Sequence, residues 1–235
     1  MRRSPLSYHH HPASRKIVNK DLYGIVQKEL HIPPLHIKLE KDNKWQGNQF
    51  DNIDWKFYRS AFMKHRQPYR VSISKLSHQL WNTNILNEKF YGQSNICPIC
   101  LTEPETWKHV VTCPCIVSTK SRDKAFQTLL TAINSGPSLL VSMISAGISS
   151  WTAKPNIETK MPSLTTSIPE LRDAFNDQSA IGWDALLRGH ISLHWKDVLI
   201  AFHAHEKGKC PQVEQKAITW TTKLITHLWV YTSSL

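Results

Sequence analysis

Residues 97–113 read CPICLTEPETWKHVVTC, which places three cysteines and one histidine in the spacing Cys-x2-Cys-x8-His-x3-Cys. In the turn Cys97-Pro98-Ile99-Cys100, two thiolates can converge on one cation. His109 and Cys113 are four residues apart, so a short helix would place both on one face. Three thiolates and one imidazole form the closed, four-ligand set that is typical of structural zinc. We therefore predict a zinc cofactor, bound by Cys97, Cys100, His109 and Cys113.

Other interpretations of these residues remain open. The cysteines could be buried free thiols beside an unrelated histidine, or a redox Cys-x-x-Cys pair. A redox pair normally lies at the strand–helix junction of a βαβ unit, which this sequence does not indicate. Cys115 could replace Cys113 as the fourth ligand, while Pro114 between them disfavours joint ligation. A bound zinc is worth on the order of 10–16 kcal/mol in zinc-finger peptides, enough to order a loop with almost no core.

The composition is that of a folded, basic chain. Hydrophobic residues make up 40% of the 235 residues and charged residues 20%, and the nine Trp favour a packed core. The formal net charge is +11, and most of it lies in residues 1–90, which hold 16 Lys and Arg against 7 Asp and Glu. Such a balance suits a polyanionic partner or an anionic membrane surface.

The sequence lacks the patterns of export and of membrane insertion. The N-terminus is basic, but no apolar signal core follows it, and the most apolar window, 137–151, is too short to span a bilayer. Five cysteines, four of them within 97–115, do not resemble a secreted disulfide scaffold. We expect an intracellular protein, cytoplasmic or nuclear, with reduced thiols and no membrane partner.

Helical periodicity dominates elsewhere, and we predict a mostly α fold: irregular helical domains around a small zinc knuckle, with room for one short hairpin. Residues 33–50 contain Pro-Pro, Gly and Asn and are expected to form a loop with one strand at 35–39. The predicted helices cover residues 21–30, 51–64 (capped by Asp51 or Asn52), 68–81, 121–134, 138–149, 167–181 (capped by Ser167), 184–205 and 211–235. The predicted domains are a flexible basic arm (1–20), a basic helical segment (21–96), the knuckle (97–115) and a helical domain (116–235) with a linker near 151–167.

Three groups of residues within about 50–200 carry a family resemblance. They are Ile53-Asp54-Trp55 followed by Lys75-Leu76-Ser77-His78, then the knuckle with Val110 after His109, and then Asp177-Gln178, Ile181-Gly182-Trp183, Leu187, Gly189, Ser192 and Trp195. Together they resemble the C-terminal region of non-LTR-like retrotransposon reverse transcriptase proteins, which often carries a Cys-Cys-His-Cys knuckle after the polymerase. The chain departs from that pattern at Gln79-Leu80-Trp81-Asn82, where relatives often show Gly and then Leu-Pro.

The resemblance implies a nucleic-acid-binding appendage that helps to hold template RNA or target DNA. It implies as partner a polymerase region that is absent from this chain. Relatives continue past the last Trp-rich helix, so by resemblance Leu235 would be the end of a fragment.

The sequence contains none of the common catalytic motifs. Two-metal polymerisation needs clustered carboxylates, typically a paired Asp-Asp, and no two acidic residues are adjacent in this chain. A phosphate-binding P-loop, a Gly-x-Ser-x-Gly elbow and a His-Glu-x-x-His pair are also missing. We expect that the chain is not an enzyme, with a dispersed ribonuclease-type carboxylate set as an alternative that no spacing supports.

A basic segment before the knuckle is the candidate phosphate-binding face. Its cations alternate with Tyr58, Tyr69 and Trp81, and the alternative is a solvated helix face with core aromatics. Trp107 beside the knuckle could stack on a base, although packing against the zinc loop is the more common role of such a residue. The candidate nucleic-acid-binding residues are Lys56, Arg59, Lys64, Arg66, Arg70, Lys75, Trp107 and Lys108.

Two classes of function fit these observations. The first is a zinc-stabilised module that binds RNA or DNA with little sequence specificity for a retroelement protein. The second is a zinc-stabilised helical protein–protein interaction module, which an exposed apolar patch around Trp220, Leu224 and Trp229 would favour. An inactive retroelement remnant is a third alternative.

Overall fold

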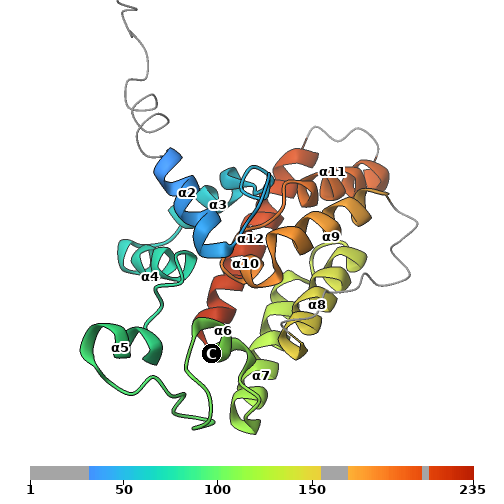
Figure 1. Cartoon of the computed structure of the whole chain (residues 1–235). Helices are drawn as coiled ribbons and strands as arrows, with labels where there is room; N and C mark the ends of the chain where they lie inside the picture. The colour runs from blue at the N-terminus through green and yellow to red at the C-terminus, as the bar shows by residue number, and fades with distance from the viewer. Residues whose placement is uncertain (1–31, 155–168, 208–211) are drawn as a thin grey trace, which may run out of the picture. The chain divides into compact units, whose positions relative to one another are not determined.

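A computed structural model describes residues 32–154, 169–207 and 212–235, and it confirms the predicted mostly α fold (Figure 1). The described helices are α2 (Ile32–Asn43), α3 (Trp55–Met63), α4 (Gln67–Ser77), α5 (Asn84–Tyr91), α6 (Trp107–Thr112), α7 (Ile116–Ile133), α8 (Ser138–Ala153), α9 (Pro169–Ile181), α10 (Trp183–Leu187), α11 (His194–Lys207) and α12 (Val213–Ser233). The predicted arm (1–20), the predicted helix 21–30, the cap Ser167, Pro211 and most of the predicted linker lie outside the described residues.

The chain divides between Lys38 and Leu39, and Leu39–Leu235 form one compact unit. Of the residues before this boundary, the structure describes only 32–38, which are the first turns of α2. The predicted boundaries at 96 and 115 fall inside the larger unit.

The predicted loop at 33–50, with its strand at 35–39, is wrong in its first part, because α2 occupies Ile32–Asn43. Pro33 and Pro34 lie in the first turn, where the backbone N–H has no partner within the helix, so the two prolines start the helix instead of preventing it. Beyond α2, residues 44–50 form turns and loop, as expected.

Several helix ends differ from the predicted ones. The helix at 51–64 begins at Trp55, and its cap is Asp54, whose carboxylate accepts a hydrogen bond from the Phe57 amide at 3.0 Å. Helix α7 begins at Ile116 rather than at residue 121. Helix α8 continues to Ala153, so the first residues of the predicted linker are helical.

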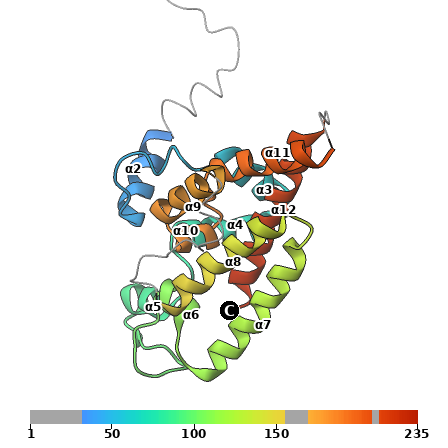
Figure 2. The ribbon, with the colours of Figure 1, turned by 90° about the vertical axis from the view of Figure 1, so that its right-hand side faces the viewer.

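Helix α12 provides the centre of the core. It packs against α3, α7, α10 and α11, and Figures 1 and 2 show it passing between these helices. Trp220, Leu224 and Trp229 on this helix are all buried. The apolar patch that would favour an interaction module is therefore covered by the protein's own helices.

Gln178 fastens α9 to the turn between α10 and α11. Its side chain is fully buried (0% exposed), and its amide donates to the carbonyls of Gly182 (3.2 Å) and His190 (3.1 Å). Its carbonyl oxygen accepts from the Ser192 amide (3.0 Å) and from the Trp195 indole (3.2 Å). Because all four hydrogen-bonding positions of the amide are satisfied, this junction is a complete buried polar network.

The predicted helix 184–205 is wrong as a single helix, because the chain turns between α10 and α11. Gly189 has φ +94°, and a Cβ atom there would lie 2.7 Å from the indole nitrogen of Trp229. That nitrogen donates to the Arg188 carbonyl at 2.9 Å. Close packing of α12 on this turn therefore requires glycine at position 189.

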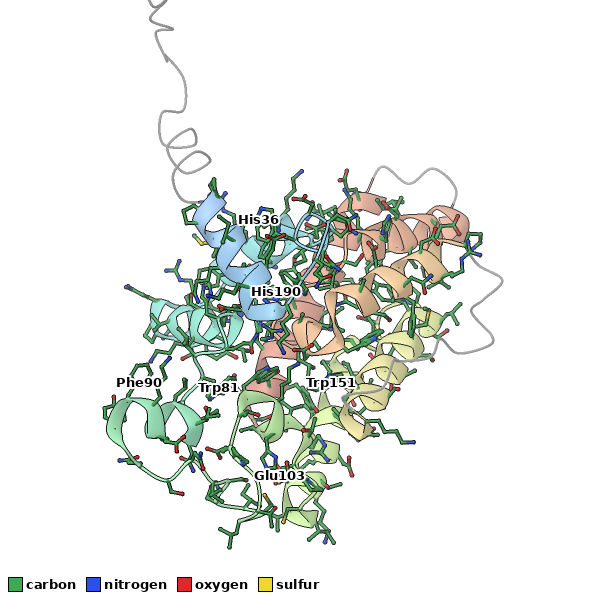
Figure 3. The ribbon with its side chains drawn as sticks, in the orientation of Figure 1. His36, Trp81, Phe90, Glu103, Trp151 and His190 are labelled. Carbon is green, nitrogen blue, oxygen red and sulfur yellow. The ribbon has the colours of Figure 1, made fainter. Side chains whose placement is uncertain are left out.

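His190 lies in an aromatic enclosure in the same turn, and Figure 3 labels it. Its ring centre is 5.6 Å from those of Trp45 and Trp55 and 5.9 Å from that of Tyr58. Neither ring nitrogen has a hydrogen-bond partner among the described residues. Burial, with the nearby charges of Arg188 and His78, holds the pKa of His190 well below its usual value, so the folded protein keeps this imidazole neutral.

We predict that Gln178→Ala lowers the free energy of unfolding by roughly 2–4 kcal/mol, because the His190 carbonyl, the Ser192 amide and the Trp195 indole lose their partner. Chemical denaturation of the wild type and the variant measures this change. The control is Asn176→Ala, an exposed position on α9, which should change stability little. Equal stability of the two variants would contradict the structural role of Gln178.

We predict that His190 makes stability fall as the pH is lowered below about 6.5, because only the unfolded chain then protonates this imidazole. His190→Phe should flatten the slope of unfolding free energy against pH between about 6.5 and 5 by up to about 1.4 kcal/mol per pH unit. Both proteins share the same cysteines and His109, so the difference between their slopes isolates His190. Identical slopes would mean that this imidazole is protonated in the fold.

Candidate metal centre

The structure brings together the four residues predicted to bind metal. One ligand atom from each of Cys97, Cys100, His109 and Cys113 lies within 4.8 Å of all the others. Ligand atoms in a tetrahedral zinc–thiolate site are about 3.8 Å apart, so a small inward movement would complete the coordination. Cys97, His109 and Cys113 are buried, and Cys100 is half-buried. These residues could hold a metal ion.

The first two cysteines lie on a tight hairpin-like turn. The Leu101 amide donates to the Cys97 carbonyl at 3.0 Å, and the Cys97 amide donates to the Glu103 carbonyl at 2.8 Å. An antiparallel bridge joins Ile96 to Pro104 behind the turn. The short hairpin that the sequence allowed is thus a single bridge, with no sheet among the described residues.

His109 is oriented by its neighbours on both sides. Thr106 caps α6 and accepts a hydrogen bond from the His109 amide at 3.0 Å. The imidazole Nε2 lies 3.3 Å from the Cys100 sulfur, while Nδ1 lies 3.1 Å from a carboxylate oxygen of Glu103, which Figure 3 labels. A carboxylate on Nδ1 fixes the proton there and leaves the Nε2 lone pair for a metal. Glu103 was not among the predicted site residues, although it lies inside the knuckle.

Cys113, and not Cys115, completes the cluster. Cys113 is the first residue after α6 and is buried, whereas Cys115 precedes α7 and stays outside the group of ligand atoms. Arg122 on α7 donates to the carbonyls of Val111 (2.8 Å) and Cys113 (3.2 Å). This guanidinium fixes the backbone at the fourth ligand and adds positive charge beside a centre whose formal charge with zinc would be −1.

The two thiols of the turn differ in acidity. Hydrogen bonds from the Thr102 side chain and from the amides of Thr102 and Glu103 lower the pKa of Cys100 to about 6. Burial raises the pKa of Cys97 instead. At neutral pH, Cys100 therefore supplies a thiolate, while Cys97 gains most from a cation that offsets the cost of burying its charge.

The basic segment lies on α3, α4 and the turn between them. Arg70 is half-buried, and its guanidinium carbon lies 5.9 Å from the ring centre of Phe62. Because Phe62 belongs to the last turn of α3, the charge of Arg70 lies near the end of that helix. No acidic residue occurs between Asp54 and Glu88, and none of the six cations forms an ion pair within the part of the chain that the structure describes. The other five, all exposed, are Lys56, Arg59, Lys64, Arg66 and Lys75.

The aromatic residues of this segment face the core. Tyr58 and Tyr69 are half-buried and pack against the main core, and the Tyr58 hydroxyl bonds to Ser77 on α4. Trp81 also packs there. These rings hold α3 and α4 in place, which matches the alternative of core aromatics behind a solvated face.

Trp107 is 5% exposed and belongs to the main core, with the Arg188 guanidinium 5.8 Å from its ring centre. A base cannot reach this ring in the folded structure, so the packing role describes Trp107 and the stacking role does not. Lys108 is exposed and forms an ion pair with Asp184 at 3.3 Å. Its charge is therefore partly offset within the protein.

Comparison of the chain with protein-family models, curated protein sequences and solved structures found no match. None of the described helices is both long enough and apolar enough to cross a membrane.

We predict that the protein, isolated without chelator, carries one equivalent of bound metal, and that Cys97→Ser abolishes it. Cys115→Ser should retain the metal, because its sulfur lies outside the cluster. Elemental analysis of the three proteins measures this. Metal-free wild type, with all thiols freely reactive, would support the alternative of buried free cysteines.

Proposed function

We propose that this chain is a zinc-stabilised nucleic-acid-binding module of a retroelement reverse-transcriptase-like protein. In this proposal it holds template RNA or target DNA for a polymerase region that is absent from the chain. The observation that carries the proposal is the run of cations without ion pairs among the described residues, five of them exposed, on α3, α4 and the turn between them, with one short helix between this run and the metal centre.

Zinc suits the donor set better than other common cations. Thiolate and imidazole ligands exclude the oxygen-preferring Mg²⁺ and Ca²⁺, and three sulfurs with one nitrogen form a tetrahedral zinc set. With four protein ligands, no coordination position is left for a substrate, so the metal's role is structural. The Glu103 contact to His109 is the outer-shell carboxylate expected of such a site.

The cations would act mainly through phosphate groups. Each phosphate contact releases counterions, so the affinity falls as the salt concentration rises. On single strands, the slope of the logarithm of the binding constant against the logarithm of the salt concentration becomes steeper by about 0.7 per contact. Phosphate contacts position a nucleic acid but carry no sequence information. Within the described residues, the six cations have no carboxylate to compete with a phosphate. We therefore expect binding with low sequence specificity.

The test is a salt series of binding to labelled single-stranded RNA and to duplex DNA. The variant Lys56→Gln/Arg59→Gln/Lys64→Gln should reduce the slope on single strands by about 2, because three phosphate contacts are lost. The matched control is Lys124→Gln/Lys216→Gln/Lys223→Gln, which removes the same charge from exposed positions on α7 and α12 and should leave most of the slope.

Three further outcomes bear on the proposal. Cys97→Ser/Cys100→Ser should weaken nucleic-acid binding, because the knuckle, which follows α4 and α5 in the chain, loses its metal. A chain that lacks residues 1–20 should still bind, and loss of binding with this deletion alone would assign the affinity to the basic arm. No binding to either nucleic acid at low salt would overturn the proposal.

A further inference from the structure

Helix α5 carries two exposed aromatic side chains that no described contact covers. Phe90 is 62% exposed and Tyr91 is 74% exposed, and their ring centres are 6.4 Å apart. The Lys89 ammonium lies 5.6 Å from the centre of the Phe90 ring. Figures 1 and 3 show α5 at the edge of the body, with Phe90 labelled. Two neighbouring rings and a cation offer flat apolar surface and positive charge together.

The metal centre, rather than the core, holds α5 in place. None of the eight residues of this helix is buried. Its first residue, Asn84, accounts for two bonds to the knuckle: the amide donates to the Glu105 carboxylate (2.8 Å) and the side chain to the Ile96 carbonyl (2.8 Å). Near the other end, Asn95 donates to Glu88 at 2.9 Å. These bonds tie α5 to the knuckle and its flanks, so we expect metal binding to order the segment that presents the two rings.

The charge around α5 indicates what would cover the rings. The acid-free run from Trp55 to Asn87, whose last cation is Lys75, ends inside this helix. Glu88 follows it and accepts the hydrogen bond from Asn95, while the Lys89 ammonium lies against Phe90. A ligand with negative charge and flat, unpaired faces fits both features. Single-stranded nucleic acid has both, whereas in a duplex the faces of the bases are stacked and hidden.

We propose that Phe90 and Tyr91 form a stacking site for unpaired bases, positioned by the metal centre. The inference rests on the proposed function, in which α3 and α4 supply the phosphate contacts. Stacking adds the base-dependent part of the affinity, which is sequence-tolerant because every base has a π face. The site therefore selects single strands over duplexes rather than one sequence over another.

The experiment compares two strands of equal length and charge, an oligothymidylate and a strand of abasic sites. At fixed salt, the full chain should bind the oligothymidylate about tenfold more tightly, since stacking of one base on an aromatic ring is worth about 5- to 150-fold. Phe90→Ala/Tyr91→Ala should bind both strands equally, with the abasic affinity unchanged. Phe90→Tyr/Tyr91→Phe keeps both rings and should retain the preference.

The matched control is Ile116→Ala/Val117→Ala, which removes two exposed apolar side chains from α7 and should leave the preference intact. Cys97→Ser should remove the preference, because α5 loses its support. Circular dichroism checks that the alanine variant keeps its helices, as expected for exposed positions.

The outcomes separate the two proposals. Salt-dependent binding in which the wild type does not distinguish the strands would overturn the stacking site and leave the phosphate-binding function standing. A preference that survives Phe90→Ala/Tyr91→Ala would overturn it as well, and would leave these rings as a surface for a protein partner. No binding of either strand would overturn the proposed function itself.

Discussion

One buried guanidinium connects the parts of this protein that carry its candidate sites. Arg188 is 1% exposed and forms an ion pair with Asp184 on α10 at 3.1 Å. It also reaches the Ser77 carbonyl at the end of α4, at 3.5 Å, and its guanidinium lies over the Trp107 ring on α6. A buried charge is tolerated only when it is paired and hydrogen-bonded, so the positions of α4, α6 and α10 are mutually constrained. The basic segment and the metal centre thus share one anchor, although neither depends on it for its chemistry.

Two kinds of interaction stabilise the fold around Arg188. The helices that surround α12 are held by burial of large apolar side chains, as in any helical core. The stretch from α5 to α6 has little such burial, and a tight turn, one β-bridge and the converging ligands take its place. Where apolar area is scarce, metal ligation is the alternative source of folding free energy. Residues 84–106, in which Cys97 alone is buried, are accordingly the part that a bound ion would stabilise most.

The sequence was most informative where the constraint is local. The spacing of Cys97, Cys100, His109 and Cys113 predicted the cluster because a turn and one helical turn suffice to bring the ligands together. The sequence pattern was misleading where contacts between distant residues determine the structure. Periodicity predicted one helix through position 189, but the chain turns at Gly189, where the indole of Trp229, forty residues later, occupies the space of a side chain. Glu103 was missed because its role depends on the ring orientation of His109. Packing was the more common role expected of Trp107, and the structure adds that its ring belongs to the main core, with Arg188 against it.

The hydrogen bonds of Gln178 have a consequence for how the chain folds. They join residues at most 17 positions apart, so α9, α10 and α11 can assemble as soon as that stretch exists. Helix α3, by contrast, packs on α12, at the far end of the sequence. During synthesis the cationic helices wait for their packing surface until α12 has emerged from the ribosome. A nascent chain of this protein therefore presents its basic segment, inside a cell full of RNA, before the fold that positions it is complete.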